Sequence, residues 1–160
     1  MNIEKATLEN AIDIANIEKI CFPPAEAANL ESIKQRINTF RNQFFILVDN
    51  SKIIGFINGM VTDIENLNDE MYENASLHNE NGKWQMIFGI DILPEYQNKG
   101  YAGMLMRHFI ENAKNENRKG VVLTCKEKLL SFYEHFGFSN EGISQSEHGG
   151  GCWYQMRLIF

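Results

Sequence analysis

The sequence predicts a single α/β domain, built on a mixed sheet with helices on its faces. Two observations carry this prediction. The chain has 160 residues, the usual size of one compact domain, and contains no linker-like stretch. Segments with helical and strand periodicity also follow one another in the order α, α, β, β, β, α, β, α, β, β. Such a mixture favours a sheet covered by helices, in one domain that extends from residue 1 to residue 160.

Two helices are predicted at the start of the chain. Apolar residues recur at three- and four-residue steps between residues 8 and 21, after a candidate N-cap at Thr7. The following pair, Pro23 and Pro24, ends this helix because proline lacks an amide proton and restricts the residue before it. A second, shorter helical face follows at residues 30–37.

Three strands and a polar excursion are predicted next. Residues 44–48 form a short apolar run bounded by polar residues, which is typical of a buried strand, and residues 53–62 would be its hairpin partner. Residues 66–82 are rich in Asn and Glu and are predicted to leave the sheet, with room for a short helix. Residues 85–93 form the next strand, which Pro94 ends because proline has no donor for a strand ladder.

The second half of the chain alternates helices and strands. A helix is predicted to start near Gly100, because apolar residues keep helical spacing from there onward, and residues 121–125 form a strand. An apolar helical face follows at residues 129–136 and ends at a glycine, which is a natural residue for a helix C-terminus. Residues 142–146 and 152–159 would form the last hairpin through a turn of three glycines.

Composition and charge restrict the function. Hydrophobic residues make up 44% of the chain and charged residues 22%, which excludes a disordered protein. With 15 Lys and Arg against 21 Asp and Glu, the formal net charge is -6, so an extended basic surface for nucleic acid or for an anionic membrane is not expected. We therefore expect a small-molecule or cationic partner, and either a monomer or a homodimer.

The charges are unevenly distributed along the chain. Residues 97–128 contain seven basic and three acidic side chains, whereas residues 63–80 contain six acidic side chains and no Lys or Arg. A polyanionic ligand would be favoured near the first segment and a cationic ligand near the second. Solvated helix faces are the alternative explanation for both.

The cysteines and the N-terminus indicate a reduced, cytoplasmic protein. Cys21, Cys125 and Cys152 are widely spaced and include no C-x-x-C pair that could hold a metal or exchange disulfides. The first 20 residues carry four acidic side chains among the apolar ones, unlike a signal peptide. No apolar run approaches the roughly 20 residues that span a bilayer.

The sharpest local feature is the segment 94–102, between a predicted strand and the helix that starts near Gly100. A glycine-bearing loop that opens a helix leaves backbone amides unpaired, and the helix dipole adds positive potential, so a pyrophosphate can bind there. The loop has too few glycines for a Walker loop or a dinucleotide-binding fingerprint. An ordinary strand-to-helix turn is the alternative.

Two motifs resemble those of the GCN5-related N-acetyltransferases, the GNAT superfamily. Residues 97–102, Gln-Asn-Lys-Gly-Tyr-Ala, resemble the acetyl-CoA loop of this family, and residues 129–138, with the pattern Phe-Tyr-x-x-Phe-Gly-Phe, resemble its late helix. The likeness spans nearly the whole chain and is closest to the arylalkylamine (serotonin) N-acetyltransferase branch, through residues 21–28, 73–78 and 123–127. It implies the GNAT fold, an α+β arrangement with a mostly antiparallel sheet of about six to seven strands and about four helices.

The resemblance implies acetyl-CoA as the co-substrate and no metal. The backbone of Ile90, Asp91 and Ile92 would run beside the pantetheine arm, as a neighbouring strand would. A strand N–H near Ile90 would stabilise the oxyanion of the tetrahedral intermediate. The pyrophosphate would be held by the side chain of Gln97 and by the backbone amides of Asn98, Lys99, Gly100, Tyr101, Ala102 and Gly103.

The resemblance also implies direct transfer of the acetyl group to a primary amine in a ternary complex, with a small arylalkylamine or polyamine-like acceptor. Tyr133 would donate its phenolic proton to the departing CoA thiolate as general acid. The alternative role for Tyr133 is core packing, although Phe132 and Phe136 on the same helical face can pack without a hydroxyl. Two other functions stay open: a CoA-binding regulatory or degenerate domain without turnover, and transfer to a protein or peptide amine.

The general base does not follow from the resemblance. Serotonin N-acetyltransferases place two histidines on alternate positions of the fourth strand, and the matching positions here are Met86 and Phe88. Neither side chain accepts a proton, although an alkylamine is mostly protonated at pH 7. His78, Glu26 and a water chain to bulk solvent are the candidates. The aromatic residues that would suit an arylalkylamine, if they line the pocket, are Phe22, Tyr72 and Trp84.

Overall fold

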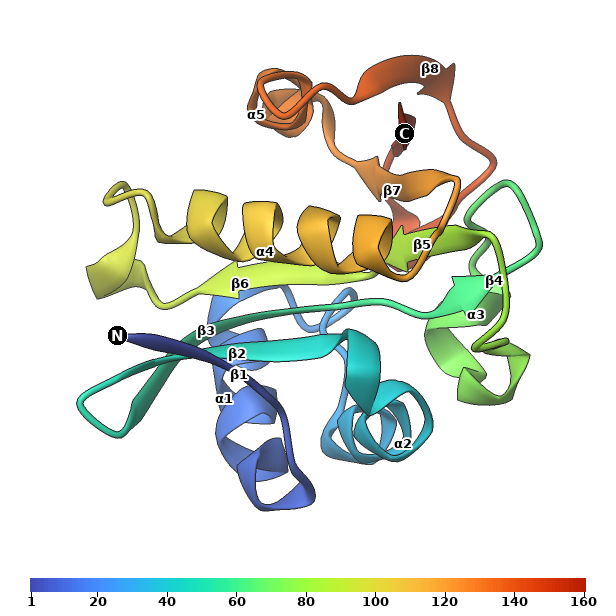
Figure 1. Cartoon of the computed structure of the whole chain (residues 1–160). Helices are drawn as coiled ribbons and strands as arrows, with labels where there is room; N and C mark the ends of the chain where they lie inside the picture. The colour runs from blue at the N-terminus through green and yellow to red at the C-terminus, as the bar shows by residue number, and fades with distance from the viewer.

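The computed structural model describes residues 1–160, and nine strands in two sheets form its centre (Figure 1). The first sheet has the strand order β1-β2-β3-β6 and the second has the order β4-β5-β7-β9-β8. Every neighbouring pair is antiparallel except β5 and β7, which run parallel. The strands are β1 (Asn2–Lys5), β2 (Phe44–Asp49), β3 (Lys52–Asn58), β4 (Val61–Thr62), β5 (Trp84–Ile87), β6 (Gly89–Ile92), β7 (Gly120–Cys125), β8 (Ser139–Ile143) and β9 (Tyr154–Ile159).

Helices cover both faces of the first sheet. The five are α1 (Ala11–Cys21), α2 (Leu30–Phe40), α3 (Glu70–Glu73), α4 (Tyr101–Asn115) and α5 (Leu130–Glu134). In Figure 1, α1 and α2 lie on one face of the sheet and α4 lies on the opposite face. Two apolar clusters result: 16 buried residues on the α4 side, including Leu105 and Phe109, and 11 on the α1–α2 side, including Ile14 and Ile37. Burial of these two faces holds the layers together.

Local sequence signals explain where the helices begin and end. The Asn29 side chain caps α2 by accepting a hydrogen bond from the Ser32 N–H at 2.9 Å. The helix predicted near Gly100 does start there, as α4. The last helix is shorter than predicted, because a 3₁₀ turn at Glu127–Leu129 precedes α5. Beyond α5, Gly137 has a φ of 98°, a left-handed conformation that glycine adopts without strain.

Two of the predicted strands are each broken into two. The prediction of single strands at 53–62 and 85–93 was wrong, because β3 and β6 pair in the first sheet while β4 and β5 pair in the second. The chain thus crosses between the sheets at both breaks, and it crosses a third time from β6 to β7 through α4. The predicted fold class is confirmed, since the sheets are mostly antiparallel and counting each broken pair as one strand leaves seven.

The break contains a β-bulge. On one side of it Asn58 pairs with Gly89, and on the other side Val61 pairs with Gln85. Two residues of the first strand therefore face three residues, 86–88, of the second. An extra residue of this kind shifts the alternation of side chains between the two faces by one position.

Beyond the bulge, β6 and β7 diverge. The parallel ladder between β5 and β7 ends where Ile87 faces Leu123. From there β6 pairs with β3 on one side, and β7 pairs with β9. The edge of β6 that faces β7 has no strand partner, so the backbone groups of Ile90 are open to a ligand, whereas the Ile92 carbonyl accepts hydrogen bonds from Gln97 and Cys21.

The two ends of the chain differ from the prediction. The edge strand β1 was not predicted; it pairs antiparallel with β2, and Ile3 packs against the core. The last hairpin also differs, because β8 begins at Ser139 and β9 at Tyr154, so the connection is the segment 144–153 rather than a tight turn at the three glycines. None of the helices combines the length and the apolar character that crossing a membrane requires.

Candidate active site

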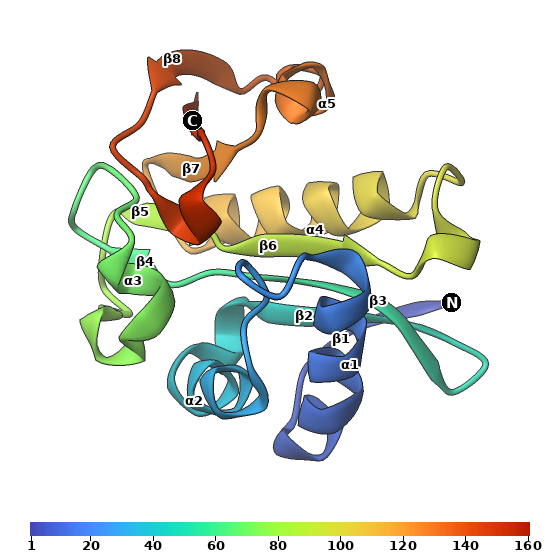
Figure 2. The same ribbon diagram turned by 180° about the vertical axis from the view of Figure 1, so that it is seen from behind.

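A cavity of about 1000 Å³ lies at the gap between β6 and β7. Its lining comes from both faces of the first sheet: the loop before α4 and helix α5 on one side, and the α1–α2 connection, α3 and the segment 144–153 on the other. Figure 2 shows the α1–α2 connection in blue and the β8–β9 connection in red on the same side of β6. A hydrogen bond of 3.0 Å between His148 Nε2 and the Glu26 carbonyl joins these two connections.

The loop before α4 has the geometry of an anion site. A 3₁₀ turn at Pro94–Tyr96 is followed by positive φ angles at Asn98, 61°, and Gly100, 87°. This turn brings the start of the 15-residue helix α4 to the cavity, with its first backbone amides unpaired within the helix. Their partial positive charge suits a phosphate group.

Most of the loop residues expected to hold the pyrophosphate reach the cavity. Lys99 is the exception, and its Nζ atom lies 6.0 Å from the centre of the Tyr96 ring instead. Gln97 donates its side-chain amide to the Ile92 carbonyl at 2.9 Å, so it also fixes the loop to the end of β6. The residues that line the cavity are Gln97, Asn98, Gly100, Tyr101, Ala102 and Gly103.

The backbone of β6 directs hydrogen-bonding groups into the gap. The Leu93 N–H donates to the Ile54 carbonyl of β3 at 2.9 Å. Since such pairs alternate along an antiparallel ladder, the N–H and C=O groups of Ile90 and Ile92 point away from β3, toward the gap. The backbone of Asp91 points toward β3 by the same alternation. Of the three β6 residues expected beside the pantetheine arm, Asp91 can therefore contribute its side chain rather than its backbone.

Tyr133 reaches the cavity from α5. Its side chain is 6% exposed, and its ring centre lies 5.0 Å from that of Phe132 and 5.9 Å from that of Phe138. Burial raises the pKa of the Tyr133 hydroxyl, and the neighbouring Cys125 adds to the increase. The hydroxyl therefore stays protonated at neutral pH, which is the state that a proton donor needs.

Aromatic side chains line the other end of the cavity. Phe22 and Tyr72, both considered for an aromatic acceptor, lie there, whereas Trp84 belongs to a separate buried cluster. The Tyr72 hydroxyl shares a hydrogen bond of 3.0 Å with the Thr124 hydroxyl, and its ring stacks on that of His148 at 4.7 Å. Burial raises the pKa of Tyr72 to about 12, so this hydroxyl also stays protonated.

The two side chains considered as general base differ in position. Glu26 lines the cavity, where its carboxylate pairs with Lys126 Nζ at 2.7 Å. His78 lies outside the cavity lining: its Nδ1 accepts a hydrogen bond from the Val61 N–H at 3.0 Å, and its Nε2 contacts Glu80 at 3.1 Å. Because both ring nitrogens are engaged, His78 has no free lone pair for an incoming amine.

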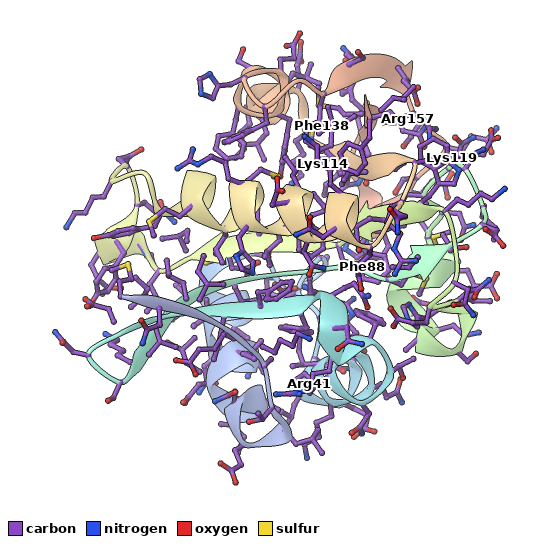
Figure 3. The ribbon with its side chains drawn as sticks, in the orientation of Figure 1. Arg41, Phe88, Lys114, Lys119, Phe138 and Arg157 are labelled. Atoms are coloured by element: carbon purple, nitrogen blue, oxygen red, sulfur yellow. The ribbon has the colours of Figure 1, made fainter.

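Three charged residues of the cavity were not predicted as side-chain participants. Glu18 of α1, Arg36 of α2 and Asp91 of β6 are 7%, 6% and 1% exposed, and all three line the cavity. Beside them lies Phe88, labelled in Figure 3, whose ring centre is 4.9 Å from the guanidinium carbon of Arg36. Of the three, Asp91 alone left a signal in the sequence, because it is the single acidic residue within an otherwise apolar strand.

The charged segments of the sequence are only partly directed at the cavity. Glu73 of the acidic segment lines it, as do Lys126 and Lys128 of the basic segment. Arg118 is buried instead, with its guanidinium 3.2 Å from the Glu80 carboxylate, so this ion pair joins the two segments to each other. No three His, Cys, Asp or Glu side chains gather closely enough to hold a metal ion.

Replacing Gly100 by Ala is expected to raise the dissociation constant of CoA roughly tenfold. A residue with a Cβ atom is strained by about 1–2 kcal/mol in the left-handed conformation that Gly100 adopts, and the loop relieves this strain by moving. Isothermal titration calorimetry with CoA measures the effect. The control is Gly142→Ala, because Gly142 has a similar φ of 91° and equally open surroundings in β8. Equal CoA affinity in both variants would contradict the loop assignment.

Solved structures of other proteins share this fold. The loading GNATL domain of CurA from Lyngbya majuscula has a TM-score of 0.88 at 21% identity, and the match covers 99% of this chain and 96% of that one. The GphF GNAT-like decarboxylase, solved in complex with isobutyryl-CoA, has a TM-score of 0.87 at 15% identity, with 99% of each chain covered. Identities this low establish a common fold and leave the function to the site.

Sequence comparison identifies the family. Serotonin N-acetyltransferase from Mesocricetus auratus is 22% identical over 140 residues, which cover 85% of this chain and 66% of that protein, just under two thirds of its length. The model of the Acetyltransferase (GNAT) family matches residues 11–138, a span that includes both motifs. This match confirms the superfamily that the motifs predicted. Because it covers most of the sequence, the chain belongs to the acetyltransferase (GNAT) family.

Proposed function

We propose that this protein transfers an acetyl group from acetyl-CoA directly to a primary amine in a ternary complex. The observation that carries the proposal is the single cavity at the gap between β6 and β7. It joins a helix N-terminus suited to a pyrophosphate with an aromatic and acidic chamber on the opposite face of the sheet. A thioester and an amine can therefore meet inside it without an acyl-enzyme intermediate.

The chemistry needs three protein groups at the gap. The amine nitrogen attacks the carbonyl carbon of the thioester, and the Ile90 N–H stabilises the negative charge that develops on the oxygen. The intermediate then breaks its C–S bond, and Tyr133 gives its proton to the departing thiolate. A general base takes one proton from the amine, so the products are the N-acetylated amine and the CoA thiol.

We infer that the acceptor is a small amine of the arylalkylamine or polyamine-like class. Phe22 and Tyr72 offer aromatic surface, and Asp69 and Glu73 bring negative charge to the same end of the cavity. The likeness to a serotonin N-acetyltransferase supports an arylalkylamine, and the acidic side chains support a polyamine equally well. A protein or peptide amine is the remaining class of acceptor.

Thiol release from acetyl-CoA tests the proposal. The purified protein is given acetyl-CoA with a panel of arylalkylamines, diamines, polyamines and a short peptide with a free N-terminus. We expect at least one small amine to accelerate thiol release and to gain an acetyl group. If none does while CoA still raises the melting temperature, the protein is a CoA-binding domain without turnover. If CoA does not bind, the proposal and that alternative both fail.

A second candidate function is the removal of CO2 from an acyl-CoA that carries a free carboxylate. It is favoured by the likeness in fold to a protein described as a GNAT-like decarboxylase, and by Lys126 at the cavity wall, which would exchange its partner Glu26 for the substrate carboxylate. In such a reaction the C–C bond to the carboxylate breaks, its electron pair forms the thioester enolate, and a donor such as His148 protonates the carbon. Conversion of malonyl-CoA to acetyl-CoA without any amine would support this candidate, and recovery of intact malonyl-CoA would remove it.

A further inference from the structure

Three buried charged side chains meet on the acceptor side of β6, and neither motif uses them. Glu18, Arg36 and Asp91 come from α1, α2 and β6, and all line the cavity. Two carboxyl groups and one guanidinium leave one unbalanced negative charge when all three are ionised. Buried charge is costly unless it is compensated, so this group favours an additional proton or a cationic ligand.

Hydrogen bonding within the group leaves Asp91 without a donor. Arg36 donates to the Asn58 side-chain oxygen at 3.3 Å and to the Tyr72 carbonyl at 3.1 Å. Both carboxyl oxygens of Asp91 are buried and have no hydrogen-bond partner. The neighbouring Glu18 carboxyl can hydrogen-bond to Asp91 only when the two acids share a proton. Asp91, a residue of the cavity lining, thus holds a buried carboxyl group whose oxygens have unused lone pairs.

The β-bulge turns Asp91 toward the acceptor side. Before the bulge, Met86 and Phe88 pack on the α2 side of the sheet. The extra residue reverses the alternation, so Ile90 packs on the α4 side and Asp91 faces the helices α1 and α2. A Cβ atom on Gly89 would lie 3.3 Å from Asp91 Oδ1, so the carboxylate leans back along the strand toward the bulge. It therefore lies one residue from Ile90, whose N–H would bind the reacting carbonyl in the proposed acetyl transfer.

The surroundings make Asp91 a stronger base than an exposed aspartate. Burial, and then the negative charge of Glu18, raise the pKa of Asp91 well above its usual value, while Arg36 has a smaller effect in the opposite direction. Cys21 of α1 also faces Asp91 and adds to the increase, and across the gap the charge of Asp91 raises the pKa of Tyr133. A carboxylate whose pKa moves toward the working pH takes a proton from an amine more readily.

We propose that Asp91 is the general base of this protein and that Glu18 and Arg36 are its positioning residues. The inference rests on the proposed acetyl transfer. An alkylammonium ion has no lone pair, so one of its N–H bonds breaks first and that proton passes to the Asp91 carboxylate. The neutral nitrogen then attacks the acetyl carbon, and the second proton that it loses replaces, through solvent water, the proton that Tyr133 gives to the thiolate. Tyr133 supplies a different proton to the thiolate from the other side of the gap. This arrangement fills the role that Met86 and Phe88 cannot take.

Asp91→Asn tests the assignment, because it keeps the shape of the side chain and removes the basic oxygen. With an alkylamine that the wild type acetylates, thiol release should fall by about 10²–10⁴-fold while CoA affinity stays within about twofold. With an acceptor that is already neutral at pH 7, such as an O-alkylhydroxylamine, the loss should be at least about tenfold smaller, because no proton has to be removed before attack. Glu111→Gln, at an exposed position of α4 outside the cavity, is the control for the loss of an acidic side chain.

The variant Glu18→Gln tests whether Glu18 tunes the base. Its pH profile of kcat/KM would not shift if Glu18 had only a structural role. The Glu18 charge raises the pKa of Asp91, so its removal lowers that pKa. A base acts in its unprotonated form, which is present above its pKa. The acid limb of the kcat/KM profile should therefore shift to lower pH in Glu18→Gln and stay in place in Glu111→Gln.

The outcomes separate the assignment from the proposed function. Equal losses with both acceptors in Asp91→Asn would overturn the assignment, and so would an unshifted acid limb in Glu18→Gln. If Asp91→Asn no longer binds CoA because it misfolds, the Glu18→Gln profile decides the question. A wild-type protein that acetylates no amine overturns the proposed function and the base together, whereas an active wild type with a fully active Asp91→Asn overturns the base alone.

Discussion

Replacing Tyr133 by Phe should lower kcat for acetyl transfer by about 10²–10⁴-fold, which is the usual contribution of a positioned general acid. The buried ring would keep its contacts with Phe132 and Phe138, and the raised pKa of the hydroxyl means that it is protonated at neutral pH. CoA affinity should change little, because the hydroxyl acts on the leaving group. Thiol release at saturating acetyl-CoA and amine, together with calorimetric titration of CoA, measures both quantities.

Tyr154→Phe is the matched control for this change. Tyr154 begins β9, outside the cavity lining, so loss of its hydroxyl should leave kcat unaltered. Melting temperatures of both variants show whether either substitution disturbs the fold. An unchanged kcat in a folded Tyr133→Phe would remove the acid role and leave Tyr133 as a core aromatic.

Replacing Gly59 by Ala should lower the free energy of unfolding by about 3 kcal/mol or more. Gly59 lies opposite the bulge, and a Cβ atom there would overlap the Met86 carbonyl oxygen and lie 2.9 Å from the Ile87 Cα. Backbone atoms of a neighbouring strand cannot turn aside as a flexible side chain can, so the overlap must separate the strands. Urea unfolding followed by circular dichroism measures the change in stability.

Gly103→Ala serves as the comparison for Gly59→Ala. A Cβ on Gly103 would meet the end of the Arg107 side chain at 3.1 Å, and this flexible chain can move away. Since alanine is favoured over glycine in a helix, Gly103→Ala should leave stability unchanged or raise it by up to about 1 kcal/mol. Equal stability of Gly59→Ala and the wild type would show that the strands at the bulge tolerate separation.

Elements whose boundaries depend on neighbouring residues were predictable from the sequence. The helix that starts near Gly100 and the turn at Gly137 follow from a loop glycine, apolar spacing and the left-handed preference of glycine. For the same reason the loop before α4 could be singled out from the sequence as a candidate anion site, which stays a prediction. Its lining residues follow one another in the chain, so one local motif describes them.

The arrangement of the strands depends on partners that are distant in sequence. The break between β5 and β6 exists because two residues of one strand face three residues of the other. The periodicity of a single segment does not reveal how many residues its partner strand places opposite it. The edge strand β1 has four residues and a single half-buried side chain, Ile3, which gives no alternating pattern to detect.

Separation along the sequence also limits the prediction of the site, because its side chains come from elements that are far apart in the chain. Asp91 was predicted for its backbone alone, through the resemblance to the family. The bulge, which turns its side chain toward α1 and α2, depends on the pairing of two strands and is not visible in either segment. Glu18 and Arg36 look like ordinary polar positions of amphipathic helices, and tertiary packing alone buries them beside Asp91. His78 was considered as a base, yet it caps the backbone of Val61 outside the cavity lining.

Direct transfer of the acetyl group within one cavity is the central claim, and mass spectrometry with isotopically labelled acetyl-CoA tests it. The protein is incubated with labelled acetyl-CoA alone and then with an accepted amine. The masses of the intact protein and of the small molecules are measured in both samples. We predict that the amine gains the labelled acetyl group and that the protein mass stays unchanged in both samples. A labelled acyl-protein that forms before the amine is added and disappears afterwards would contradict the account, and so would the absence of any labelled amine.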